Sequence, residues 1–289
     1  MRPYVISTDT CCDLPESYCV DNNIDIHPLY YRFGDEVYGG EAQLPMDVFY
    51  SRMRNGEMPT TMAVNPETSK ELFLKHIQNG EDVLHIAFSS GLSSSYQNAV
   101  IAANELMEEH PESRIIVIDS LCASLGQGLL VHEAVRLMKE GMSLDELATA
   151  VEDAKLHVAH HFTVDNLFHL FRGGRVSRAT AIVGTLAGIK PLLHVDNEGH
   201  LINIGKVRGR KKSLTALVDK LGSDSGSYLE KSSIIGISHG DSLEDAKFVA
   251  SLIEERYGKK EFIINMLCPT IGSHTGPDLI ALFFFADKR

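Results

Sequence analysis

A serine-rich turn after a short apolar run carries the clearest chemical signal in this 289-residue sequence. The run Val83–Phe88 is followed by Ser89-Ser90-Gly91-Leu92-Ser93-Ser94-Ser95, and a helical pattern begins near Tyr96. The first N–H groups of a helix have no partner within the helix and lie at the positive end of its dipole, while serine hydroxyls add further donors. A strand, a hydroxyl-rich turn and a helix start in this order therefore predict a site for an anionic group.

Other polar side chains also follow predicted strands or lie in predicted loops. Asp9 and Thr10 come directly after the apolar segment Tyr4–Ser7, where an open α/β sheet binds ligands, but Asp9 equally suits the cap of a turn or helix. Thr60 and Thr61 fall in a predicted loop, where a loop hydroxyl needs no further role. A basic cluster forms either a solvated helix start or a docking surface for an acidic partner; its members are Lys206, Arg208, Arg210, Lys211 and Lys212.

Composition excludes several classes of function. The net charge of −12 argues against nucleic acid as a partner. The five cysteines contain no C-x-x-C pair, and no carboxylate or cysteine spacing completes a metal site around His157, His160 and His161, so we predict no metal. The N-terminus has no signal-peptide core and no apolar run reaches the length of a membrane span, which predicts a cytoplasmic protein without stable membrane insertion.

Enzymatic chemistry at the serine turn is one of two interpretations. The sequence has no G-x-S-x-G elbow, no phosphate-binding loop of the G-x-x-x-x-G-K-[ST] type and no G-x-G-x-x-G fingerprint. His274 could serve Ser93 as a base in an acyl hydrolase or transferase. Binding without catalysis explains the same residues, because hydroxyls, arginine and histidine all donate hydrogen bonds to a carboxylate.

The elements that must position these residues change character along the chain. Strand-like segments alternate with helical ones up to about residue 158, which predicts an N-terminal α/β domain (1–160) with a parallel sheet covered on both faces. A hairpin around Asp196–Gly199 and further strands predict a C-terminal α+β domain (161–289) with a mixed or antiparallel sheet. Predicted helices span 45–55, 66–78, 96–109, 125–139, 143–158, 165–171, 177–188 and 243–257.

Several blocks, in a fixed order, resemble the DegV family. They are Ser7-Thr8-Asp9-Thr10, Ser89-Ser90-Gly91-Leu92-Ser93 with Tyr96-Gln97, Gly173-Gly174-Arg175-Val176-Ser177, Lys206-Val207-Arg208, and Gly272 with His274-Thr275-Gly276-Pro277. The resemblance implies a bacterial protein of two α/β-type domains that binds a long-chain fatty acid in an apolar tunnel. It further implies no catalysis of its own, no cofactor, and a partner, fatty acid kinase, that makes the acyl-phosphate for phospholipid synthesis.

The resemblance also implies roles for single residues. Thr61 and Ser93 match the carboxylate-binding threonine and serine, and Ser94, where the family usually has glycine, would offer its backbone N–H. Arg175 and His274 match residues near the head group. Arg208 matches an arginine tied to the kinase interaction.

Two departures from the family pattern touch the predicted site. Thr61-Met62-Ala63-Val64-Asn65 stands where the family usually has Thr-Ser-Gln-Pro-Ser, so the threonine is kept without its neighbours. Asp278 replaces a usual glycine after the His-Thr-Gly-Pro block.

Overall fold

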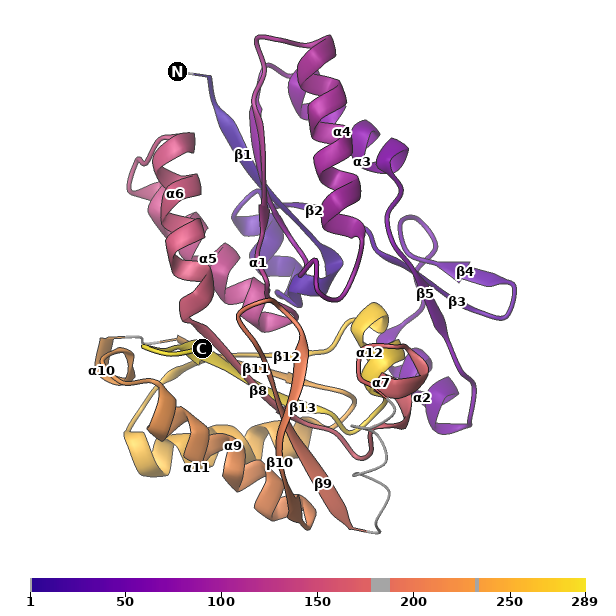
Figure 1. Ribbon diagram of the computed structural model, residues 1–289, viewed down its shortest axis with the longest axis vertical. Coiled ribbons are helices and arrows are strands. Elements are labelled where there is room, and N and C mark those ends of the chain that lie inside the picture. Colours follow the sequence, from indigo (N-terminus) through magenta and orange to yellow (C-terminus); the bar gives the residue numbers. More distant parts are fainter. Residues whose placement is uncertain (1, 178–187, 232–233) are drawn as a thin grey trace.

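The computed structural model describes residues 2–177, 188–231 and 234–289 and contains a parallel sheet and, below it in Figure 1, a mixed sheet. The parallel sheet has the strand order β2-β1-β6-β7, and every neighbouring pair is parallel, as predicted. All six residues of β6 are buried, as expected for a central strand covered on both faces. The strands are β1 (Tyr4–Asp9), β2 (Asp25–His27), β6 (Asp82–Ala87) and β7 (Ile115–Asp119).

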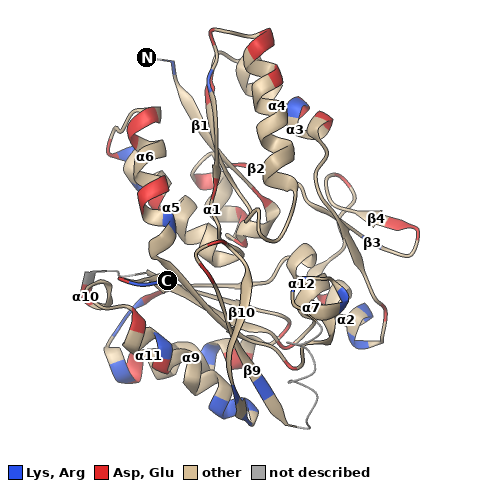
Figure 2. Cartoon of the chain, viewed as in Figure 1, with Lys and Arg blue, Asp and Glu red and all other residues tan. Residues whose placement is uncertain are grey.

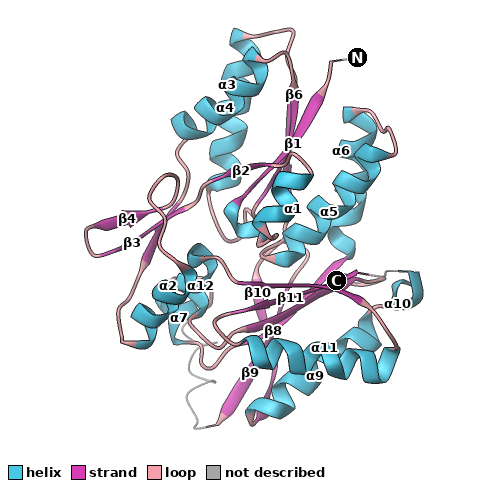
Figure 3. Cartoon of the chain, turned by 180° about the vertical axis from the view of Figure 1, so that it is seen from behind, coloured by secondary structure: helices cyan, strands magenta, loops and turns pink. Residues whose placement is uncertain are grey.

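Helices cover both faces of this sheet (Figure 3). On one face α3 (Pro66–Gln78) and α4 (Ser95–Glu109) share a core with β1, β6 and β7. On the other face lie α5 (Leu125–Lys139) and α6 (Leu144–Ala154), and the short α1 (Glu16–Asp21) contributes Cys19 to the same core. Ten residues of α5 are buried because this helix also contacts strands of the mixed sheet. The helix α5 thus lies between the two sheets.

Capping residues in the sequence predicted several helix starts correctly. Asn65 caps α3 by accepting a hydrogen bond from the Thr68 N–H at 2.8 Å, and Ser143 and Glu146 form the predicted capping box of α6. The predicted end of α6 was wrong. The helix stops at Ala154, and after one 3₁₀ turn the chain enters β8 (Val158–Thr163). The six residues of β8 are all buried, and this packing overrides the continued helical pattern.

A small antiparallel sheet of order β4-β3-β5 joins the first half to the second. It consists of β3 (Tyr30–Phe33), β4 (Glu36–Tyr38) and β5 (Thr60–Met62), and α2 (Met46–Arg54) packs beside it. The predicted loop at Thr60 and Thr61 was therefore wrong. Thr61 lies directly opposite Tyr31 in the β3–β5 ladder, which fixes its orientation.

The mixed sheet has the order β10-β9-β8-β13-β11-β12, and only β11 and β12 pair in parallel. The predicted hairpin is confirmed as β9 (Ile189–Val195) and β10 (Leu201–Arg208). α9 (Arg210–Asp224) and α11 (Leu243–Tyr257) cover one face, and α10 (Tyr228–Lys231) lies near its edge (Figure 1). The remaining strands are β11 (Ile234–His239), β12 (Glu261–Met266) and β13 (Ile280–Phe285).

Three further predictions concern the second half of the chain. The predicted helix at 165–171 is the shorter α7 (Phe168–Arg172). The stretch with Gly272 and His274, to which the sequence assigned neither helix nor strand, forms the helix α12 (Pro269–Thr275). The helix predicted at 177–188 lies almost entirely outside the described residues. The predicted domain division at residue 160 falls inside β8, whose residues pair with β13 and β9 of the mixed sheet.

Two acidic residues connect the halves of the molecule. The buried carboxylate of Asp13 accepts hydrogen bonds from the Cys268 N–H at 2.8 Å and from the Ser124 hydroxyl at 2.5 Å. Arg54 at the end of α2 donates to both carboxylate oxygens of Asp278, at 2.9 and 3.1 Å. Asp278 has a φ of +64°, so it adopts the left-handed conformation for which glycine is the usual residue. Asp278 therefore occupies a backbone conformation that glycine also adopts readily, and it forms an ion pair with Arg54.

Candidate functional site

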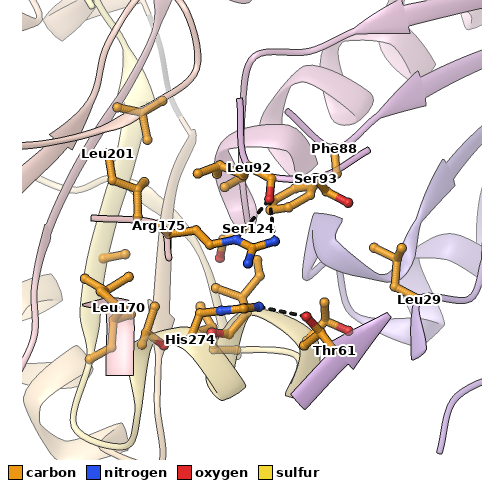
Figure 4. A pocket seen from close by; sticks show the side chains of 18 of the residues that line it. Leu29, Thr61, Phe88, Leu92, Ser93, Ser124, Leu170, Arg175, Leu201 and His274 are labelled. Carbon is orange, nitrogen blue, oxygen red and sulfur yellow. Dashed lines mark hydrogen bonds between the residues drawn. The ribbon is translucent and has the colours of Figure 1, made fainter. Parts of the chain in front are cut away.

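A cavity of about 290 Å³ lies between the serine turn and the mixed sheet, and both halves of the chain line it (Figure 4). Its polar residues gather near Thr61, Ser93, Arg175 and His274. Most of the remaining wall is apolar and includes Leu29, Phe88, Leu92, Phe162, Leu170, Val195, Leu201, Leu267, Leu279 and Phe283. The arrangement suits a molecule with one polar end and a hydrocarbon body.

The serine turn is held in place by the side chain of Asp9. One carboxylate oxygen accepts from the Phe88 N–H at 2.8 Å and the other from the Cys11 N–H at 2.9 Å, where Asp9 caps a 3₁₀ turn. Asp9 is therefore a structural cap, one of the two roles expected from the sequence. Ser89 extends the anchorage by donating to the carbonyl of Gly199 at 2.9 Å, which ties the turn to the β9–β10 hairpin.

The structure brings Ser93 and Ser94 to the rim of the cavity. The Ser93 hydroxyl lies 2.9 Å from that of Ser95 and accepts a hydrogen bond from the Ser95 N–H at 3.2 Å. Ser94 is the residue before the first turn of α4 and is exposed. Both line the cavity, so hydroxyls and the start of a helix face the same space.

Thr61 and His274 meet across the cavity from different parts of the chain. The Thr61 hydroxyl lies 2.8 Å from Nε2 of His274, which projects from α12 (Figure 4). Burial, with a contribution from the nearby Arg175 and Arg172, lowers the pKa of His274 to about 3, so the imidazole is neutral at pH 7. Its Nδ1 is buried and has no hydrogen-bond partner among the described residues.

Arg175 joins the glycine turn to the serine turn. Its guanidinium donates twice to the carbonyl of Leu92, at 2.8 and 3.1 Å, and once to the carbonyl of Gly173 at 2.5 Å. The side chain is half-buried and its pKa is lowered by burial. Among the described residues its hydrogen-bond acceptors are neutral carbonyl oxygens, so this cation lies beside the polar residues of the cavity without a carboxylate partner.

Four polar residues of the wall were not predicted from the sequence as part of the site: Ser124, His160, Thr270 and Thr275. His160 accepts from the Ala123 N–H at 3.2 Å through Nε2, so its Nδ1–H must donate to the Val158 carbonyl at 2.9 Å. Ser124 is held by Asp13. In the sequence His160 stood out only as a possible metal ligand beside His157 and His161, and the domain boundary was predicted at the same place.

Arg208 lies apart from the cavity, on the edge strand β10. It is exposed, and its cross-strand partner is Ile189. Figure 2 shows basic residues around the start of α9 and the adjoining strands. Within this cluster Arg210 pairs with Asp245 at 2.7 Å, whereas Lys206 and Arg208 lie on β10 rather than at a helix start.

Among the described residues no group of three or more histidine, cysteine, aspartate or glutamate side chains is arranged to hold a metal ion. The part of the chain that the structure describes also contains no helix long and apolar enough to cross a membrane.

Comparison with known proteins identifies the family. Residues 4–287 match the family described as uncharacterised protein, DegV family. The chain belongs to the DegV family. A DegV domain-containing protein of Clostridium perfringens is 40% identical over 291 residues, which cover 100% of this chain and 99% of that protein. A Lactococcus lactis DegV domain-containing protein is 36% identical and covers 99% of this chain and 98% of its own length.

Solved DegV structures share the fold. A DegV lipid-binding protein of Thermotoga maritima has a TM-score of 0.86 at 28% identity, covering 99% of both chains. DegV of Bacillus subtilis, described as a fatty-acid-binding protein, has a TM-score of 0.85 at 28% identity, covering 99% of this chain and 100% of its own. The similarity extends over both sheets and confirms the predicted fold class, an N-terminal parallel-sheet α/β domain with a C-terminal α+β domain.

Proposed function

We propose that this DegV protein binds a long-chain fatty acid in the cavity, holds the carboxylate with Thr61 and Ser93, and presents it to a fatty acid kinase. The observation that carries the proposal is the largely apolar cavity in which hydroxyls, a neutral histidine and an arginine lie close together. Solved relatives described as fatty-acid-binding proteins support it. In this proposal the protein performs no catalysis and needs no cofactor besides its lipid ligand.

Burial of the acyl chain of the ligand supplies most of the affinity. Each methylene removed from water contributes about 0.8 kcal/mol, so roughly 16 carbons gain on the order of 10 kcal/mol before the costs of association. A carboxylate that enters an apolar cavity must find donors, because an unpaired buried charge is very costly. The polar end of the cavity therefore sets the orientation of the ligand.

The tautomer of the neutral His274 decides whether the Thr61 hydroxyl can donate to the ligand. If Nε2 carries the proton, it donates to the Thr61 oxygen, and the Thr61 hydroxyl hydrogen is free to donate to the carboxylate. Ser93 donates from the opposite side and Ser94 offers its N–H, while the charge of Arg175 favours the anion. The same groups also accommodate a protonated acid, since hydroxyls accept as well as donate.

Removing the two hydroxyls tests the head-group assignment. We expect Thr61→Val and Ser93→Ala each to raise the Kd for hexadecanoic acid about 10-fold and the double variant about 100-fold, because each lost hydrogen bond to a charged group is worth about 1.5–3 kcal/mol. Calorimetry with delipidated protein gives the Kd. Thr60→Val is the matched control, since Thr60 is exposed and does not line the cavity. Unchanged affinity in the double variant would refute the assignment.

The hydrolase alternative requires Ser93 and His274 to form a dyad. In the structure the Ser93 hydroxyl contacts Ser95, and Nε2 of His274 contacts Thr61. No observation favours a serine nucleophile, so binding remains the proposed activity. Ester turnover that disappears in Ser93→Ala would reverse this conclusion.

The exposed Arg208 is the proposed contact with the kinase. We expect Arg208→Ala to lower the rate of acyl-phosphate formation at least 5-fold in an assay with a fatty acid kinase, with the Kd for fatty acid unchanged, because Arg208 is exposed and does not line the cavity. Arg32→Ala, at an exposed arginine of the small sheet, is the control. An unchanged rate would exclude Arg208 from the contact.

A further inference from the structure

The tip of the β9–β10 hairpin packs directly against the serine turn. In Figure 1 this hairpin rises from the mixed sheet towards the parallel sheet. The buried hydroxyl of Ser89 donates to the carbonyl of Gly199, 110 residues away, at 2.9 Å. A Cβ atom at Gly91 would lie 2.8 Å from the same carbonyl oxygen and 2.9 Å from that of Glu198. The two backbones therefore meet at a distance that leaves no room for a side chain.

Ser89 also organises the serine turn from within. Its carbonyl accepts hydrogen bonds from the N–H of Leu92 at 3.0 Å and from that of Ser93 at 3.1 Å. Its hydroxyl accepts from the Gly91 N–H at 3.2 Å, and its own N–H donates to the carbonyl of Cys122 at 3.0 Å. Because the backbone of Ser93 is bonded directly to Ser89, a displacement of Ser89 also moves Ser93.

The hairpin tip is fixed by the side chain of Asp196. Its Oδ1 accepts from the N–H of Glu198 at 3.0 Å and from that of His200 at 2.8 Å. The Gly199 N–H donates to the Asp196 carbonyl at 3.0 Å, and a Cβ atom at Gly199 would overlap the Ser89 hydroxyl. The carbonyl of Gly199 is therefore held in one orientation and offers Ser89 a fixed acceptor.

We propose that Ser89 is a positioning residue, which transmits the fixed geometry of the hairpin tip to Ser93 and so holds the Ser93 hydroxyl where it can donate to the ligand carboxylate. This inference rests on the proposed function and deepens it. Ser89 does not line the cavity, so its effect on binding passes through Ser93. A hydroxyl that is already held in place binds more tightly, because hydrogen bonds weaken when misaligned and ordering a mobile donor costs entropy.

A double-mutant cycle on the Kd for hexadecanoic acid tests this coupling. In calorimetry with delipidated protein, Ser89→Ala should raise the Kd about 5-fold, because the turn loses its hydrogen bond to Gly199. In a Ser93→Ala background the same substitution should change the Kd by less than about 2-fold, since the hydroxyl that it positions is gone.

Ser213→Ala is the matched control for the loss of a buried hydroxyl. It removes a hydrogen bond of 2.8 Å from a buried serine to the carbonyl of Arg210, at the start of α9 and outside the cavity. Its effect on the Kd should stay below about 2-fold. Asp196→Ala provides a second variant that loosens the hairpin tip without altering the serine turn. It should raise the Kd about 3-fold, again only while the Ser93 hydroxyl is present.

Far-UV circular dichroism establishes that each variant is folded. Equal losses from Ser89→Ala with and without the Ser93 hydroxyl, or no loss from either folded variant, would overturn the positioning role and leave fatty-acid binding intact. An unchanged Kd in Ser93→Ala itself, or failure of the unmodified protein to bind the acid, would instead refute the proposed function and the positioning role with it.

Discussion

Replacing Gly173 by alanine is expected to weaken fatty-acid binding roughly 10- to 100-fold, although the new methyl group would not touch the ligand directly. A Cβ atom at this position would overlap Nδ1 of His274 and lie 2.9 Å from its Cε1. The φ of Gly173 is −75°, so alanine adopts the backbone conformation without strain and the clash alone produces the effect. Displacing the imidazole breaks its contact with Thr61 and disturbs the polar end of the cavity.

A double-mutant cycle isolates this mechanism. In a His274→Ala background the space is vacated, and Gly173→Ala should then change the Kd by less than 2-fold. Gly205→Ala is the control substitution, because a Cβ atom at Gly205 has no neighbour within 4 Å. Additive losses from Gly173→Ala and His274→Ala would contradict coupling through the imidazole.

Lowering the pH from 7 to 5 is expected to reduce the free energy of unfolding by on the order of 3 kcal/mol. Burial lowers the pKa of His27, His85, His160 and His161. Below pH 6.5 the unfolded chain takes up protons that these folded imidazoles do not, so stability falls as the pH falls. For His161, with a pKa of about 4, the loss at pH 5 is about 2 kcal/mol.

The surroundings of these imidazoles make protonation costly. His27 and His85 stack with ring centroids 4.5 Å apart, so two adjacent charges would repel each other in the core. Asp25 lies 3.4 Å from His27, and His85 contacts the Ser7 hydroxyl at 2.9 Å. Lys75 and His76 also pair with Asp25, and the pKa of His76 is raised, which opposes the trend in part. His161 lies 3.0 Å from Asp224.

Two buried carboxyl groups raise the free energy of unfolding as the pH falls, which opposes the effect of the imidazoles. Burial raises the pKa of Asp9 to about 6 and that of Asp13 to about 7, so their contribution to stability is present below pH 4 and is lost as the pH rises towards 7. Between pH 7 and 5 these four imidazoles, together with His274 and its pKa of about 3, outweigh the two carboxyls. Asp13→Asn keeps an acceptor for the Cys268 N–H and suits the positive φ of this residue. Asparagine cannot take up the proton that stabilises the fold on acidification. The free energy of unfolding should therefore fall more steeply between pH 7 and 5 in Asp13→Asn than in the unmodified protein.

Urea unfolding followed by circular dichroism at pH 5, 6 and 7 measures the effect. A free energy of unfolding that is constant or rises on acidification would contradict the predicted dominance of the imidazoles.

Sequence patterns specified the long elements well and the short ones poorly. The predicted bounds of α3, α5 and α11 coincide with the structure, because each helix combines an apolar stripe with clear end signals. β5 has three residues and α12 seven, too few for periodicity to distinguish them from loops. α12 also contains glycine, serine and threonine, and packs closely against Tyr50 of α2 through Gly272.

The sequence by itself determined the strand, serine turn and helix start, because these depend on neighbouring residues and on local hydrogen bonding. It also carried the resemblance to the DegV family, which the comparisons confirm. Only the tertiary structure decided that Thr61 meets His274, 213 residues away, and that both face the serine turn. The physical reason is that such contacts arise from the packing of α12 against α2 and the small sheet, which no local pattern encodes.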